Sequence, residues 1–113
     1  MFRVEERRAA DYAKHVHAMI TSGGMLAHPL SRMANATEST RRKPLDVGVH
    51  GNTVVIGGIS PRDLDSARTE VDNMGGYHDV LHTITTHQDT YQGRTVHSVS
   101  VAFFRKIIAR TKR

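Results

Sequence analysis

Hydrophobic positions between residues 3 and 22 recur at three- and four-residue spacing, which is the repeat of an amphipathic helix. The stripe consists of Ala9, Tyr12, Ala13, Val16 and Ile20. The opposite face is charged or polar, and Gly23 and Gly24 follow directly, as is typical of a helix end. The pattern predicts a long helix within residues 1–24 that lies on a sheet or on a neighbouring subunit.

From residue 45 onward the repeat changes from a helical one to an alternating one. Val47 and Val49 share one side of a predicted strand, and Val54 and Ile56 share one side of the next. Gly51-Asn52 lies between them and is a standard hairpin turn. These residues predict a pair of short antiparallel strands.

A second helix is predicted directly after this strand pair. Ser60 can cap it, Pro61 suits the first turn, and Asp63 follows the cap by three residues. Its buried stripe is expected to be Leu64, Ala67, Val71 and Met74. Gly75-Gly76 ends the helix.

Two more strands complete the pattern, the first over residues 77–86 and the second ending at Phe104. A polar link over residues 88–93 is expected to form the hairpin loop. In the last strand Val99, Val101 and Phe103 share one face, and polar side chains make up the other: Thr95, His97, Ser98 and Ser100. One face of the sheet is therefore expected to contact water or a partner.

These elements indicate an α+β fold, with a four-stranded, mainly antiparallel sheet and one capped helix packed on it. We expect a single domain over residues 1–113, made of the helix (1–24), a long loop (25–44), a ββαββ core (45–104) and a basic tail (105–113). The loop docks on its own domain or on an adjacent chain. The tail forms a short helix or an ordered arm.

Composition favours a protein that works with partners. Only 38% of the 113 residues are hydrophobic, and the chain has no Trp and only six Phe and Tyr, so the core is modest and gains from sister subunits. There is no Cys, no apolar stretch long enough for a membrane helix and no apolar core of a secretory signal. Synthesis in the cytoplasm is the expectation.

The formal net charge is +5, and basic residues gather in two blocks without acidic neighbours. We single out eight of them as candidate contacts to nucleic acid or a partner: Arg41, Arg42, Lys43, Arg105, Lys106, Arg110, Lys112 and Arg113. Such blocks suit phosphate backbones or acidic protein surfaces. A solvated basic terminus is the alternative.

The eight histidines raise the question of a metal site. His82, His87 and His97 could come together across the last hairpin, but no carboxylate or thiol is placed to complete a site. Common nucleophile motifs are absent, and the carboxylates are spaced as on solvated helix faces. We therefore expect no metal, no cofactor, no small-molecule substrate and no enzymatic activity.

The expected order strand, helix, strand, strand, helix from Thr53 to the end resembles an RNA recognition motif. Residues 54–59 are similar to the first conserved strand of that family, and residues 93–103 are placed like its third. That family stacks bases on aromatic side chains. The matching positions here are Val55, Ser98 and Ser100, with Phe103 retained, and a small basic nucleic-acid-binding module is the function that this resemblance implies.

A second resemblance covers more of the chain. It is carried by Pro29-Leu30-Ser31, Lys43-Pro44-Leu45, Gly51-Asn52-Thr53-Val54-Val55, Gly75-Gly76 and the run from Val99 to Arg105. In this order these elements resemble small neck and tail-completion proteins of tailed phages. The resemblance implies a non-enzymatic virion protein, made in the host cytoplasm, that forms a homo-oligomeric ring at the head-tail junction. Its expected partners are adjacent virion proteins and packaged DNA.

Overall fold

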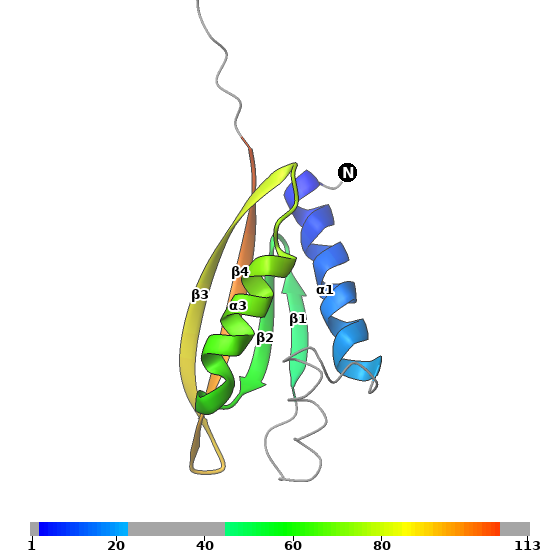
Figure 1. The fold of residues 1–113 in the computed structure, drawn as a ribbon. Coiled ribbons are helices and arrows are strands. Elements are labelled where there is room, and N and C mark those ends of the chain that lie inside the picture. Colours follow the sequence, from blue (N-terminus) through cyan, green and yellow to red (C-terminus); the bar gives the residue numbers. More distant parts are fainter. Residues whose placement is uncertain (1–2, 23–44, 107–113) are drawn as a thin grey trace, which may run out of the picture.

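The computed structural model describes residues 3–22 and 45–106, and it confirms the α+β class. In chain order the elements are α1 (Val4–Ser22), β1 (Asp46–His50), β2 (Thr53–Ile59), the 3-10 turn η1 (Pro61–Asp63), α3 (Leu64–Met74), β3 (Val80–Tyr91) and β4 (Arg94–Arg105) (Figure 1). The predictions for the loop at 25–44 and for the tail beyond Lys106 lie outside the described residues.

The four strands form one antiparallel sheet in the order β1-β2-β4-β3. Helix α3 connects β2 to β3, and β4 returns between these two strands, which is a split βαβ arrangement. The fourth strand of the sheet is β1, which precedes this unit in the chain. The edges of the sheet are therefore β1 and β3, and they lie on opposite sides of the molecule (Figure 1).

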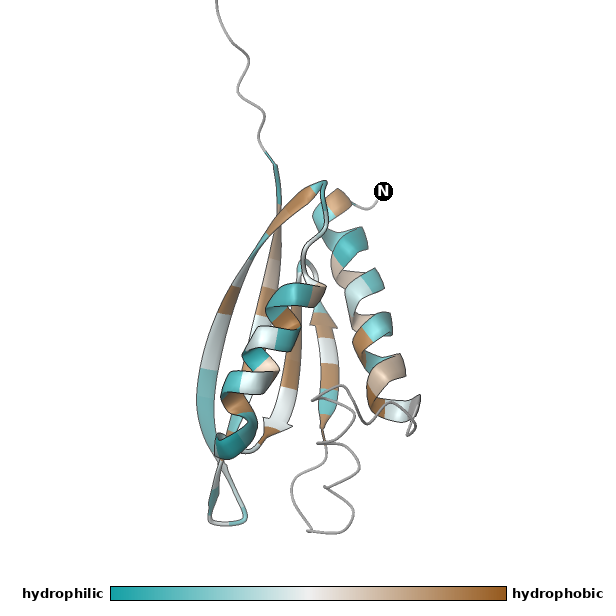
Figure 2. Cartoon of the chain, viewed as in Figure 1, coloured by the Kyte–Doolittle hydropathy of each residue, from teal (hydrophilic) through white to brown (hydrophobic). Residues whose placement is uncertain are grey.

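Both helices cover the same face of the sheet. The shared core takes Ala9, Tyr12 and Val16 from α1 and Ala67 and Val71 from α3. The strands contribute alternate residues, namely Val54, Ile56, Ile59, Val80, Val99, Val101 and Phe103. Hydrophobic positions alternate with paler ones along β1 (Figure 2). The predicted helix stripes are confirmed, although Ala13, Ile20, Leu64 and Met74 are only partly buried.

The link between β3 and β4 is much shorter than the sequence predicted. Strand β3 continues to Tyr91, so the turn consists only of Gln92 and Gly93. Both have positive φ, at 52° and 78°, which is the pattern of a type I′ turn. This turn matches the right-handed twist of paired strands, and pairing therefore continues up to Tyr91 and Arg94.

The start of the second helix also differs from the prediction. Ser60 precedes a 3-10 turn rather than an α-helix, and its side chain caps no backbone N–H. Its hydroxyl instead donates to Oδ2 of Asp63 at 2.8 Å, while the backbone N–H of Asp63 donates to the carbonyl of Ser60 at 3.0 Å. Pro61 has no N–H to offer, and these two bonds close the turn in place of a capping box.

The glycine pair at 57 and 58 lies inside β2. The register with β4 shifts between Ile56 and Ile59, and Gly58 has a φ of 85°. A side chain at Gly57 would meet Oδ1 of Asp46 on the neighbouring strand at 2.5 Å. The two glycines therefore form a bulge and allow a close approach between strands.

Candidate interaction site

An ion pair links α1 to the segment before β3. Arg8 donates from Nε and Nη2 to the carboxylate of Asp79, at 3.1 and 2.8 Å, and from Nη1 to Asp11 at 3.2 Å. The hydrogen bond from Arg8 holds the pKa of Asp79 below its usual value, and the same bond raises the pKa of Arg8. Because each charge already has a partner, the pair is better suited to anchoring α1 than to catalysis.

An aromatic cluster lies beneath this ion pair. Tyr12 and Tyr77 both meet the ring of Phe103 edge-on, with centroids 5.3 and 5.7 Å apart, and Arg8 stacks over Tyr77 at 5.4 Å. The Tyr12 hydroxyl donates to the carbonyl of Val71 at 2.8 Å. Burial raises the pKa of both tyrosines, most strongly that of Tyr12. The raised pKa values of Tyr12 and Tyr77 therefore follow from their packing in the core.

The three histidines considered for a metal site are not brought together. His82 faces the helices and shares a hydrogen bond of 2.7 Å with Oδ1 of Asp72, its Nε2 carrying the proton that the carboxylate accepts. His87 pairs with Ser98 and points to the opposite face. His97 was expected on the polar face, but it shares the covered face with Val99. It lies six residues along β4 from Phe103, which is the cross-strand partner of His82, so His97 and His82 are far apart.

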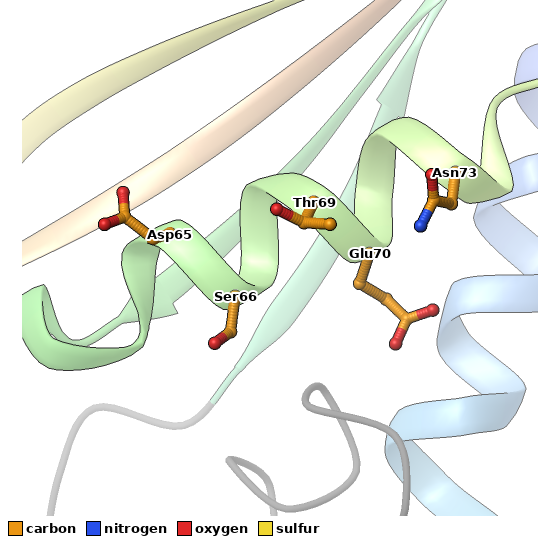
Figure 3. A pocket seen from close by; sticks show the side chains of 5 residues that line it. All are labelled: Asp65, Ser66, Thr69, Glu70 and Asn73. Carbon is orange, nitrogen blue, oxygen red and sulfur yellow. The ribbon is translucent and has the colours of Figure 1, made fainter.

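No group of three metal-ligating side chains occurs in the described ranges 3–22 and 45–106. The hollow drawn in Figure 3, of about 360 Å³, is lined by polar side chains that all come from α3: Asp65, Ser66, Thr69, Glu70 and Asn73. These side chains leave the helix in different directions rather than converging on one point. The described part of the chain therefore gives this hollow a single wall and no defined ligand geometry.

Of the eight basic candidates, the structure describes two. Arg105 is the last residue of β4 and is exposed, and Lys106 donates from Nζ to the carbonyl of His78 at 2.6 Å. Arg41, Arg42, Lys43, Arg110, Lys112 and Arg113 lie outside the described residues.

The surplus of basic residues comes from parts of the sequence outside the described residues. Residues 3–22 and 45–106 contain nine Lys and Arg against ten Asp and Glu, a formal charge of −1. The remaining residues contain seven basic side chains and one acidic, which accounts for the +5 of the whole chain. The helices and the sheet therefore form a nearly neutral unit.

No described helix lies over the second face of the sheet, which we call the open face. Its centre carries small, hydroxyl or aliphatic side chains and no charge: Gly48, Val55, Thr83, Thr85, Ser98, Ser100 and Ala102. At one end Leu81 and Phe104 are direct cross-strand partners, 56% and 45% exposed. This apolar pair is an unusual feature of a solvent-facing strand end.

The position of Phe103 contradicts the expectation that it is retained as a base-stacking residue. Phe103 is fully buried between Tyr12 and Tyr77 on the covered face. The aromatic side chain on the open face is Phe104, which the sequence placed at the end of the last strand without a role. Strict alternation from Val99 and Val101 could have identified it, because residue 104 has the parity of the polar positions.

The two edges of the sheet differ in length but share one property. In the described residues neither β1 nor β3 has a strand on its outer side. Strand β3 presents twelve residues without Pro, Lys or Arg, and its register with β4 is unbroken from Val80 to Tyr91. Pro, basic side chains and breaks in register are features by which proteins normally block pairing at a sheet edge. Strand β3 has none of them, so its edge can pair with another strand.

Comparisons with known proteins do not identify a relative. No family model matches the chain, and no curated protein and no solved structure matches it either. Among the described helices, none combines the length and the apolar character needed to cross a membrane. Arguments about function therefore depend on the geometry of the sheet.

Proposed function

We propose that this chain is a non-enzymatic structural subunit of a tailed-phage virion, of the neck, tail-completion or connector type. It acts by associating with copies of itself into a ring at the head-tail junction, and with the virion proteins on either side. Its action is geometric, since the ring sets a diameter and presents the same surface from every subunit.

The observation that carries this proposal is the amount of sheet left unpartnered. Among the described residues, two edges without a neighbouring strand, an open face with an uncharged centre and the exposed Leu81-Phe104 pair are all features of surfaces that become buried in assemblies. The titratable groups with shifted pKa values belong to the contacts that anchor α1. The described structure thus offers surfaces for packing and no converging set of reactive groups.

The test is the mass of the full-length chain in solution, measured by light scattering after size exclusion over a range of concentrations. We expect a mass several times 12.6 kDa, with ring-shaped particles in negative-stain electron microscopy. A chain that stays at the mass of one subunit at every accessible concentration contradicts the proposal.

A small nucleic-acid-binding module remains the second candidate, favoured by the basic blocks of the sequence and by Phe104 on the open face. The centre of that face has no Lys or Arg, unlike a surface that follows a phosphate backbone. If this candidate is right, the chain stays small, binds oligonucleotides with an affinity that falls steeply with salt, and loses binding when Arg41, Arg42 and Lys43 are replaced by Gln.

A further inference from the structure

The direction of the two edge strands determines how copies of this sheet can join. Four antiparallel strands in the order β1-β2-β4-β3 leave β1 and β3 running in opposite directions. A copy rotated about an axis parallel to the strands keeps its strand directions and its helices on the same side. Its β1 therefore meets β3 of the first copy in antiparallel orientation, which is the arrangement needed for a closed ring.

The observed registers define rows of side chains that run across the sheet. One row on the covered face is Val49, Val54, Val101 and Ile84, and the adjacent row on that face is Val47, Ile56, Val99 and Thr86. Continuing these rows into a second copy places its Val49 beside Ile84 and its Val47 beside Thr86. All of these side chains lie on the helix-covered face, so the alternation of the two strands agrees.

We propose that β3 of one copy pairs with β1 of the next in this register, from Thr83 opposite His50 to His87 opposite Asp46. This inference rests on the proposed ring and names the contact that builds it. On the open face it places His87 within reach of the exposed Asp46 carboxylate of the next copy. On the covered face it buries Val49, which is 45% exposed in the single chain.

Two hollows beside these strands agree with the pairing. A hollow of about 450 Å³ lies between α3 and β3 and ends on Ile84, with Asp65, Arg68 and Asp72 on its wall. Another, of about 390 Å³, lies between α1 and β1 and ends on Val49, with two basic and two acidic side chains on its wall: Arg7, Lys14, Glu6 and Asp11. Joining the edges in this register brings the two hollows together.

The inference is tested on the full-length chain with two variants, Val49→Lys and Thr86→Lys, each of which blocks one edge. Thr86 is exposed and Val49 nearly half exposed, so neither variant removes a core side chain. A Lys pointing into the new contact prevents pairing, because its charge is buried against Val47 or Ile84 of the other copy. Each variant alone should fall from a multiple of 12.6 kDa to the mass of one subunit.

Mixing the two variants in equal amounts distinguishes the head-to-tail contact from other arrangements. Each variant keeps one intact edge, so the mixture should form a dimer of twice the subunit mass and grow no further. A mixture that stays at one subunit mass overturns the inference. So does loss of assembly in Thr86→Lys but not in Val49→Lys, since that result means that two β3 strands pair with each other.

Thr90→Lys is the matched control, because it adds the same charge to an exposed position of the same strand, outside the proposed register. It should keep the wild-type mass, and circular dichroism should show all three variants folded. If the wild type assembles and both edge variants assemble equally well, the inference fails while the proposed function stands. If the wild type is always a single subunit, the proposed function fails as well.

Discussion

At the scale of single residues, neighbouring positions in this chain have opposite roles. Phe103 fills the core between two tyrosines, whereas Phe104 lies on the open face beside Leu81. The hydrophobic pattern predicts the first, but it cannot explain an exposed aromatic residue beside it. A partner that covers the open face would explain why a Phe is placed there.

The Asp79 carboxylate predicts a dependence of stability on acid pH. Its folded pKa lies below the usual value near 3.9, so its contribution is present above that pH and is lost as the pH falls through the folded value. Asp79→Asn should therefore be less stable than wild type at pH 7, and the difference should shrink below about pH 4. Urea unfolding at both pH values measures this, and a constant difference would contradict it.

Gly75 predicts a packing conflict. A Cβ there would approach the His82 ring to 3.1 Å, and this ring is held by Asp72 on one side and packs near Phe103 at 6.2 Å between centroids. Because the ring cannot easily retreat, Gly75→Ala should lower the free energy of unfolding by about 1–3 kcal/mol.

The same change made in a His82→Ala background tests this explanation. Without the ring there is nothing to overpack, so Gly75→Ala should then cost much less. An equal cost in both backgrounds would mean that the backbone, not the imidazole, requires the glycine.

At the scale of elements, the order and type of helices and strands could be predicted because their periods are clear. The errors lie where a side chain or a turn competes with the general rule. Strand β3 extends further than predicted because Gln92 adopts the positive φ that a two-residue turn requires. Ser60 bonds Asp63 rather than the backbone, since Pro61 and the 3-10 turn alter the helix start.

The turn at residues 92 and 93 predicts that substitutions at its two positions change the stability of the protein in opposite directions. Gln92 has a φ of 52°, which Asn adopts more readily, so Gln92→Asn should stabilise the hairpin by up to about 1 kcal/mol. Gly93 has a φ of 78° and open space around it, so Gly93→Ala should cost roughly 1–2 kcal/mol from backbone strain alone. Thermal unfolding of both variants measures the two shifts. Destabilisation by both would contradict a type I′ turn.

At the scale of the whole molecule, the sequence predicted the class of fold but not the candidate site. The net charge and the basic blocks predicted contacts to nucleic acid or a partner at residues such as Arg41, Arg42 and Lys43. The described sheet is nearly neutral, and its distinctive surfaces are its two edges. Strand order and register decide which residues lie at an edge, and both depend on contacts between distant parts of the chain. No local pattern contains that information.

The shared core predicts that α1 and the sheet unfold together, as one domain requires. Tyr12→Ala removes a buried ring and its bond to Val71, and should cost about 3–5 kcal/mol. In wild type and variant, urea transitions followed by circular dichroism and by tyrosine fluorescence should coincide. A helix signal lost at lower urea than the fluorescence signal would show that α1 is an independent unit.

The packing of Tyr12 on Phe103 joins the first described element to the last. During synthesis α1 emerges before every strand of the sheet, and β4, which carries Phe103, is the last of these strands to be made. During that interval Tyr12 and Val16 are not yet buried against the complete sheet. Chaperone binding or premature contact between nascent chains then competes with correct folding. Translation speed between residues 22 and 103 is therefore expected to influence the yield of native protein.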